Sequence, residues 1–107
     1  MLETRERAEE ARFAHRQDLA FRTHARRDRV FGRWAAHLMG LRGQAVEDYA
    51  RRLVMADVAG TDDELLAVVR GDLIDCGVSG VKASEDRLRR KLERLQAIFH
   101  AQLEARS

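Results

Sequence analysis

Residues 3–39 read ETRERAEEARFAHRQDLAFRTHARRDRVFGRWAAHLM, a stretch that has no proline and only one glycine, Gly32. The alanine, glutamate, arginine and leucine residues that dominate it are strong helix formers. Apolar residues occupy the i, i+3, i+4 and i+7 positions of one helical face near its end: Phe31, Trp34, Ala35 and Leu38. The stretch therefore predicts one long helix, which the glycines at positions 40 and 43 are expected to end.

Three shorter helices and no strand are predicted after this stretch. The second helix is expected over about 44–58, where apolar residues again share one face. The fourth is expected to run from Ser84, which acts as its N-cap, to about residue 106. The fold class is therefore all-α, a four-helix bundle with a long first helix.

The third helix is predicted from the sequence Thr61-Asp62-Asp63-Glu64, which has the spacing of a capping box. In such a box the Thr61 hydroxyl accepts from the N–H of Glu64, and the Glu64 carboxylate accepts from the N–H of Thr61. The helix is expected over about 62–76. Its apolar face ends with Cys76, which we expect to be a buried small hydrophobic residue.

The first helix is too long for the rest of the domain. At 1.5 Å per residue it would measure about 55 Å, the second and third helices about 22 Å each, and the fourth about 33 Å. Residues 3–18 contain one large apolar side chain, Phe13, whereas residues 19–39 contain several. Because apolar burial provides most of the stabilisation, we expect residues 1–19 to project as an arm from a bundle domain of residues 20–107.

Charged pairs at helical spacing are expected to support the arm: Glu3–Arg7, Arg5–Glu9 and Glu9–Arg12. Each pair contributes only about 0.2–0.5 kcal/mol to a helix, so the arm could fold fully when a groove of a partner receives it. Two alternatives stay open at this point. The arm could be an ordinary solvated helix end, or it could double back onto the bundle.

Composition limits the class of protein. The chain has 107 residues, of which 36% are charged and 45% hydrophobic, which suits one small domain. Its net charge of +2 sums +3 for residues 1–40, −4 for 41–80 and +3 for 81–107. The 18 acidic residues disfavour nucleic acid as a partner. No apolar run reaches the ~20 residues of a membrane span and no secretion signal is evident, so we expect a cytoplasmic protein without membrane insertion.

Four arginines form a stripe that is the one candidate anion- or nucleotide-binding surface: Arg22, Arg26, Arg29 and Arg33. A solvated helix face explains the same spacing, and we favour that interpretation. The four histidines are scattered and the single cysteine has no partner, so no metal site is predicted. No nucleophile lies beside a base, so we expect a protein that is not an enzyme and needs no cofactor, with ATP or ADP binding left open.

Several stretches in order along the chain resemble one family: residues 5–15 (RERAEEARFAH), 19–22 (LAFR), 25–27 (ARR), 32–40 (GRWAAHLMG), Tyr49-Ala50, Val54, Ala56-Asp57 and 60–63 (GTDD). Each piece alone is easily matched, because alanine and arginine are common. The ordered combination, with the single tryptophan between Gly32 and Gly40, is more specific. In this respect the chain resembles the ATPase inhibitor zeta subunit family.

The resemblance implies a small alphaproteobacterial four-helix protein that binds the catalytic head of the membrane-bound F-type ATP synthase. Its N-terminal segment, here about residues 2–19, would enter a catalytic interface between the α and β subunits and reach the γ subunit. There it would stop rotation in the direction of ATP hydrolysis. The residues expected to contact the synthase are Arg5, Arg7, Glu9, Glu10, Arg12 and Phe13, with Phe13 as the apolar anchor.

The chain departs from the family pattern at two places. Arg16-Gln17 stand where acidic residues are usual, and Asp28 stands where asparagine is common. Two other functions are kept beside inhibition. One is a nucleotide- or nucleic-acid-binding module that uses the arginine stripe, and the other is a scaffold in which the arm pairs with a second copy.

Overall fold

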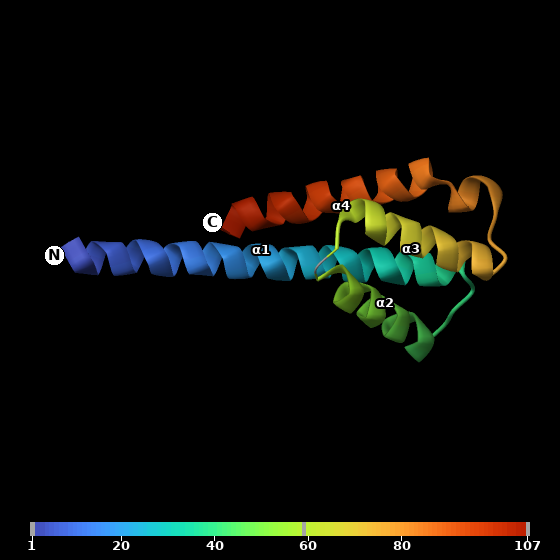
Figure 1. Cartoon of the computed structure of the whole chain (residues 1–107), viewed down its shortest axis with the longest axis horizontal. Helices are drawn as coiled ribbons and strands as arrows, with labels where there is room; N and C mark the ends of the chain where they lie inside the picture. Colours follow the sequence, from blue (N-terminus) through green and yellow to red (C-terminus); the bar gives the residue numbers. More distant parts are fainter. Residues whose placement is uncertain (1, 59, 107) are drawn as a thin grey trace.

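The computed structural model describes residues 2–58 and 60–106, and within them every regular element is helical. The elements are α1 (Leu2–Leu38), α2 (Gln44–Asp57), α3 (Asp62–Asp75), the short 3-10 helix η1 (Gly80–Ala83) and α4 (Glu85–Arg106). The predicted all-α fold with four helices and a long first helix is confirmed (Figure 1). The 3-10 turn was not predicted, and it begins at the last glycine of the connection before α4.

The molecule is a rod with a bundle at one end. It measures 63 × 26 × 22 Å, and its Cα radius of gyration is 17.1 Å, above the ~13 Å expected of a sphere-like domain of this length. In Figure 1, α2 and α3 pack against the C-terminal part of α1, whereas α4 lies alongside α1 and ends well before its N-terminus. The N-terminal part of α1 therefore extends beyond every other helix.

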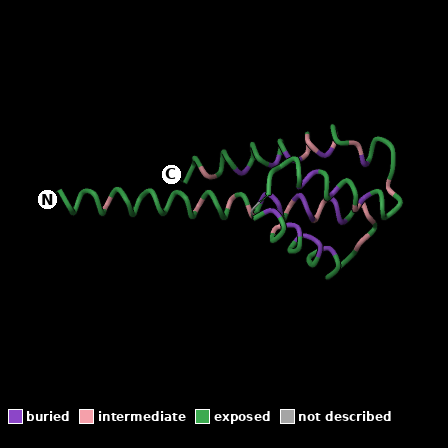
Figure 2. The backbone as a smooth tube through the Cα atoms, viewed as in Figure 1, coloured by how far each residue is buried: buried purple, intermediate pink, exposed green. Residues whose placement is uncertain are grey.

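The hydrophobic core lies in the bundle and draws on all four helices. Its fully buried members include Phe31 and Ala35 of α1, Val69 of α3 and Leu88 of α4. Figure 2 shows that the buried part of α1 is confined to its C-terminal half. The predicted stripes of α2, α3 and α4 face this core through the following buried side chains: Val46, Tyr49, Leu53, Leu65, Leu66, Leu73, Leu92, Leu95 and Phe99.

Gly32 sets the distance between α1 and α2. A Cβ atom at this position would lie 2.9 Å from the Cα atom of Ala50 and 3.2 Å from the Leu53 side chain. Backbone atoms cannot move away as a flexible side chain can, so glycine is required for this close approach. The turn that follows uses Gly40 and Gly43 at φ of 87° and 59°, which confirms the predicted end of the first helix.

Two predicted helix starts are confirmed by their caps. The Thr61 hydroxyl accepts a hydrogen bond from the N–H of Glu64 at 3.2 Å, and the Ser84 hydroxyl accepts one from the N–H of Arg87 at 3.3 Å. The return bond from the N–H of Thr61 to the Glu64 carboxylate stays a prediction. Side-chain oxygens thus satisfy backbone N–H groups in the first turns of α3 and α4, where no intrahelical acceptor is available.

Three side chains are less buried than predicted. Cys76, predicted to be buried, is exposed, because α3 ends at Asp75 and Cys76 is its C-cap with a non-helical backbone. Phe21, counted among the anchored residues of α1, is 60% exposed. At that level α4 is the element that lies alongside α1, so one side of the helix faces solvent (Figure 1). Trp34, interpreted as a core residue, is half-buried and packs against the core from its edge.

Candidate functional site

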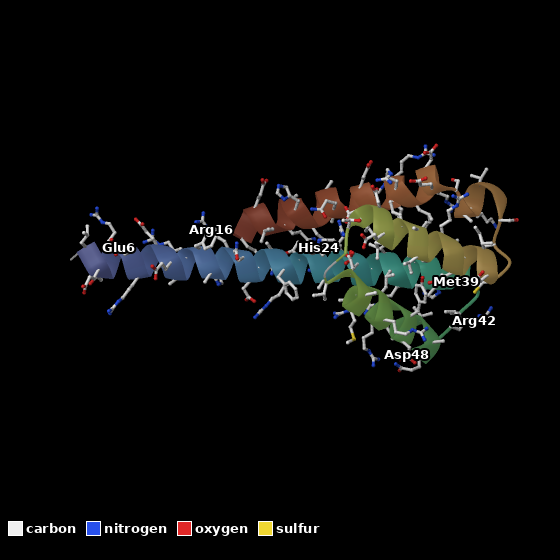
Figure 3. The ribbon with its side chains drawn as sticks, viewed as in Figure 1. Glu6, Arg16, His24, Met39, Arg42 and Asp48 are labelled. Carbon is white, nitrogen blue, oxygen red and sulfur yellow. The ribbon has the colours of Figure 1, made fainter. Side chains whose placement is uncertain are left out.

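Within the predicted arm of residues 1–19, Leu19 is half-buried, so from here on we call residues 2–18 of α1 the arm. The arm is exposed along its whole length apart from the half-buried Ala8. A helical segment of this length corresponds to a projection of about 25 Å. Its large apolar side chains are open to solvent, since Leu2 is 71% exposed and Phe13 is 57% exposed. Figure 3 places Glu6 in a part of the arm that no other element reaches.

The predicted ion pairs of the arm do not form. Within residues 2–58 and 60–106, the pairs Glu3–Arg7, Arg5–Glu9 and Glu9–Arg12 all have their charged atoms more than 4.0 Å apart. This prediction was wrong, because water solvates exposed charges well and fixing two long side chains costs conformational entropy. The charged groups of the arm are consequently available to a partner.

Most of the predicted contact residues lie on neighbouring faces of the arm, and Glu9 belongs to both. Arg5, Glu9 and Arg12 line one open hollow together with Leu2, Thr4 and Ala8. Phe13 lies one turn from Glu9 and Glu10, the i−4 and i−3 positions of the same helix face. Arg7 belongs to neither group. The structure thus presents an aromatic ring with carboxylates beside it, and a neighbouring surface of mixed charge.

The root of the arm is held by a buried network of charges that connects all four helices. Arg27 of α1 is 2% exposed and lies at the centre of this network. Its guanidinium donates to Asp28 at 2.9 and 3.0 Å, to Asp62 of α3 at 2.9 Å and to Gln96 of α4 at 2.9 Å. Asp57 of α2 lies 3.6 Å from the same group. One side chain of α1 is therefore hydrogen-bonded to both α3 and α4 and lies beside Asp57 of α2.

A half-exposed histidine, His24, lies between the buried carboxylates of the network and solvent. His24 Nε2 lies 2.9 Å from an Asp57 oxygen and 3.4 Å from an Asp28 oxygen. Figure 3 places His24 where α1 passes the ends of α2 and α3. Both carboxylates are buried, at 1% exposed for Asp28 and 5% for Asp57.

Burial changes the acidity of this network. Loss of solvation, together with the hydrogen bond to the Asp57 carboxyl, raises the pKa of Asp28 to about 7 against the lowering effect of Arg27. Burial lowers the pKa of Arg27, but the hydrogen bonds to Asp62 and Asp28 outweigh this, so the pKa of Arg27 is raised overall. Arg27 is therefore charged, whereas Asp28 exchanges its proton near neutral pH.

The same residues have the spacing of a metal site. One ligand atom each of His24, Asp28 and Asp57 lies within 4.8 Å of the others, a spacing that a cation could bridge. The Arg27 guanidinium, however, already lies against both carboxylates at 2.9 and 3.6 Å. The guanidinium already supplies the positive charge that a metal ion would bring, and it would repel a metal ion. The arrangement is therefore a network of ion pairs rather than a metal centre.

The sequence did not reveal this network. Arg27 is one of many arginines in α1, and nothing in its spacing separates a buried arginine from a solvated one. The expected departure of Asp28 from the family pattern was the one hint at this position, and it does not identify the partners.

The predicted arginine stripe does not form a surface of free cations. Arg22 pairs with Asp18 at 3.1 Å, and Arg33 pairs with Glu47 at 2.9 Å. Arg26 lies 5.1 Å from the centre of the Phe99 ring and donates to Gln102. Arg29 is exposed. Three of the four arginines thus have partners within the chain, and anion or nucleotide binding by the stripe stays a prediction.

A comparison with protein families decides the assignment, because the family model of the ATPase inhibitor subunit zeta matches residues 1–102. The chain belongs to the ATPase inhibitor subunit zeta family. This confirms the resemblance that the sequence indicated. The comparisons with curated proteins and with solved structures returned no match.

Membership in the zeta family makes the chain an inhibitor subunit of an ATPase, associated with ATP synthase. The match covers both the arm and most of α4, so the zeta family includes the projecting segment as well as the bundle. Among the helices that the structure describes, none combines the length and the apolar character that crossing a membrane demands.

Proposed function

We propose that this zeta subunit inhibits ATP hydrolysis by the F-type ATP synthase through its arm. Residues 2–18 insert into a catalytic interface between the α and β subunits of the head, reach the γ subunit and block rotation in the hydrolytic direction. The bundle stays outside and positions the arm. The protein is a regulator that performs no catalysis of its own.

The observation that carries the proposal is the exposure of Phe13. This aromatic ring is 57% exposed on an arm about 25 Å long, and among the residues that the structure describes no ring or cation contact covers it. Aromatic side chains at protein interfaces often contribute about 1 kcal/mol or more each, provided that the partner covers them. Phe13 is therefore the expected anchor, and Glu9, Glu10, Arg5 and Arg12 are expected to make charged contacts around it.

The buried network supports the same mechanism. A segment that stops a rotating element must resist a sideways load at its root. The Arg27 side chain joins α1 to α3 and α4, and Asp57 brings α2 into the same network. Because removal of one partner leaves buried charges uncompensated, the network opposes tilting of α1 relative to the bundle.

Substitution of the anchor tests the proposal, and the chain offers a matched control. Phe13→Ala and Phe21→Ala each remove an exposed phenylalanine of α1, 57% and 60% exposed respectively. Only the first lies in the arm. Phe13→Ala is expected to raise the concentration that half-inhibits a cognate catalytic head by at least about tenfold, which corresponds to about 1.4 kcal/mol. Phe21→Ala is expected to change it less than about threefold, or well under about 1 kcal/mol. Equal inhibition by the two variants would exclude Phe13 as the anchor.

Deletion of the arm gives a second test. Because residues 1–18 contribute no buried side chain to the core among those described, the remaining chain is expected to keep its helical bundle and its cooperative unfolding. It is also expected to lose inhibition. Full inhibition by the shortened protein would show that the bundle, rather than the arm, acts on the ATPase.

A further inference from the structure

A second surface of the molecule carries charged groups that the proposed function does not use. It lies on the bundle rather than on the arm. Four basic residues of α4 occupy i, i+3, i+4 and i+7 positions and therefore share one helix face: Arg87, Arg90, Lys91 and Arg94. Together with Trp34 of α1 they line an open hollow of about 260 Å³. We call these five residues the α4 basic face. Trp34 lies about 32 Å further along α1 than Phe13, so this face is separate from the arm.

The indole ring of Trp34 lies beneath two of these cations. The Arg87 guanidinium carbon is 5.6 Å and the Lys91 ammonium nitrogen 5.5 Å from the ring centre. The other face of the aromatic cluster is closed by Phe31, whose ring centre lies 5.7 Å from that of Trp34. Trp34 is half-buried and lines the hollow, so part of its surface remains accessible there.

The four cations have no acidic partner. Within residues 2–58 and 60–106, no carboxylate oxygen lies within 4.0 Å of a side-chain nitrogen of any of them. Neighbouring arginines behave differently, since Arg89 pairs with Asp63 and Glu85, and Arg33 pairs with Glu47. Four like charges on one helix face repel each other at i, i+3 and i+4 spacing. An anionic partner would relieve this repulsion.

The surroundings of the face restrict the kind of anion. Glu85, Asp86 and Glu93 of α4 carry negative charge directly before the face and within its span. A long polyanion or an extended anionic membrane would have to contact these carboxylates as well, which is unfavourable. The hollow is open, and its lining residues all lie inside α1 or α4, where backbone N–H groups bond within the helix and cannot cradle a small phosphate. A short chain of carboxylates with an apolar group to cover the indole fits best.

We propose that the α4 basic face is a docking surface for a short acidic segment of a partner protein. Carboxylates of the segment pair with Arg90, Arg94 and the outer N–H groups of Arg87 and Lys91. An apolar side chain of the segment packs on Trp34. This contact holds the bundle independently of the arm, and it does not depend on the inhibitory mechanism proposed above.

Trp34 provides a direct measurement, because it is the single tryptophan of the chain. The full chain is titrated with a tryptophan-free peptide of six glutamates and one leucine while the indole emission is recorded. A saturable change in emission is expected. Raising the salt concentration from about 50 to about 200 mM is expected to weaken binding several-fold, because screening of exposed charges increases. Inorganic phosphate and phosphatidylglycerol vesicles serve as competing probes.

Charge variants decide the location. The variant R87Q/R90Q/K91Q/R94Q is expected to bind the peptide at least tenfold more weakly than the natural chain. The control variant R42Q/R51Q/R52Q/R70Q removes the same number of charges from exposed positions outside α4, and it is expected to bind within twofold of the natural chain. Both variants change the net charge from +2 to −2, so a difference between them reports position rather than total charge.

A double variant with fewer changes separates a loss of binding from a loss of folding. R90Q/R94Q alters the two exposed members and leaves the cations over Trp34 in place, so its fold is expected to be unchanged, and a loss of at least threefold in affinity is expected. Equal weakening by the α4 and control variants would overturn the proposal. So would saturable binding of phosphate or vesicles in the absence of peptide binding.

Discussion

Replacement of Asp28 by asparagine tests the electrostatics of the arm root. The Asp28 oxygen that accepts from Arg27 Nε at 3.0 Å and from Arg27 Nη2 at 2.9 Å would be kept as an amide oxygen. The new amide nitrogen can donate to Asp57, as the protonated carboxyl does. The variant would therefore imitate the protonated form of Asp28 and remove its titration, while Arg27, Asp57 and His24 stay in place.

The size of the effect follows from the pKa of Asp28, which burial and the hydrogen bond with Asp57 raise from 3.8 to about 7. A carboxyl group whose pKa is higher in the folded state binds more protons when folded than when unfolded. Its contribution to stability is complete below about pH 4 and is lost as the pH rises toward about 7. At about 1.4 kcal/mol for each pKa unit, the loss is at most about 4 kcal/mol. Above about pH 7 it changes little further.

Urea denaturation followed by circular dichroism measures this difference. Near pH 5, about one unit above the pKa of an unfolded aspartate, Asp28→Asn is expected to exceed the natural chain in stability by less than about 2 kcal/mol. Near pH 8.5 the advantage of the variant is expected to grow to as much as about 4 kcal/mol. A difference between the two proteins that does not change with pH would refute the reasoning. So would a variant that is less stable at pH 8.5, since an ionised Asp28 paired with Arg27 would then be the more stable form.

Substitutions at three further positions test the packing, the charged network and a helix cap, each by urea denaturation. Gly32→Ala is expected to lower the free energy of unfolding by about 1–3 kcal/mol, because its Cβ would lie 2.9 Å from the Ala50 Cα atom; a neutral effect would show that α1 and α2 can separate easily. Arg27→Leu is expected to cost about 3–5 kcal/mol near pH 8.5, because it leaves buried carboxylates uncompensated; a loss below about 1 kcal/mol would contradict the network. Thr61→Ala is expected to cost about 1 kcal/mol through loss of the α3 cap, and Thr61→Ser is expected to retain most of the stability.

The features that the sequence predicted well are those that depend on neighbours along the chain. The long first helix follows from residues 3–39, which lack proline, and its end follows from Gly40 and Gly43. The cap at Thr61 depends on a residue only three positions away. The exposure of Phe13 followed from lengths alone, since a helix of about 55 Å must extend beyond helices of about 22 and 33 Å.

The features that could not be predicted depend on contacts between distant parts of the chain. Arg27 is buried because Asp62 and Gln96, 35 and 69 residues later, lie within hydrogen-bond distance. No local pattern contains that information. The prediction that Cys76 is buried was wrong for a local reason. Its spacing continues the apolar face of α3, but the helix ends at Asp75, one residue earlier. The non-helical backbone at Cys76, with φ of −86° and ψ of 7°, takes its side chain off the apolar face of the helix.

The position of the charged network explains how a small domain can carry a long projecting helix. Hydrophobic packing of α1 begins near Val30 and Phe31, whereas the arm ends at residue 18, so about a dozen residues, or about 18 Å, lie between them. Over this span α1 has α4 beside it, and Phe21 remains exposed. An apolar contact would tolerate sliding and rotation, because the hydrophobic effect is not directional. The hydrogen bonds of Arg27 are directional, and they connect α1 to α3 and α4 at fixed angles. The network therefore adds directional contacts between α1 and the other helices at the point where α1 leaves the hydrophobic core.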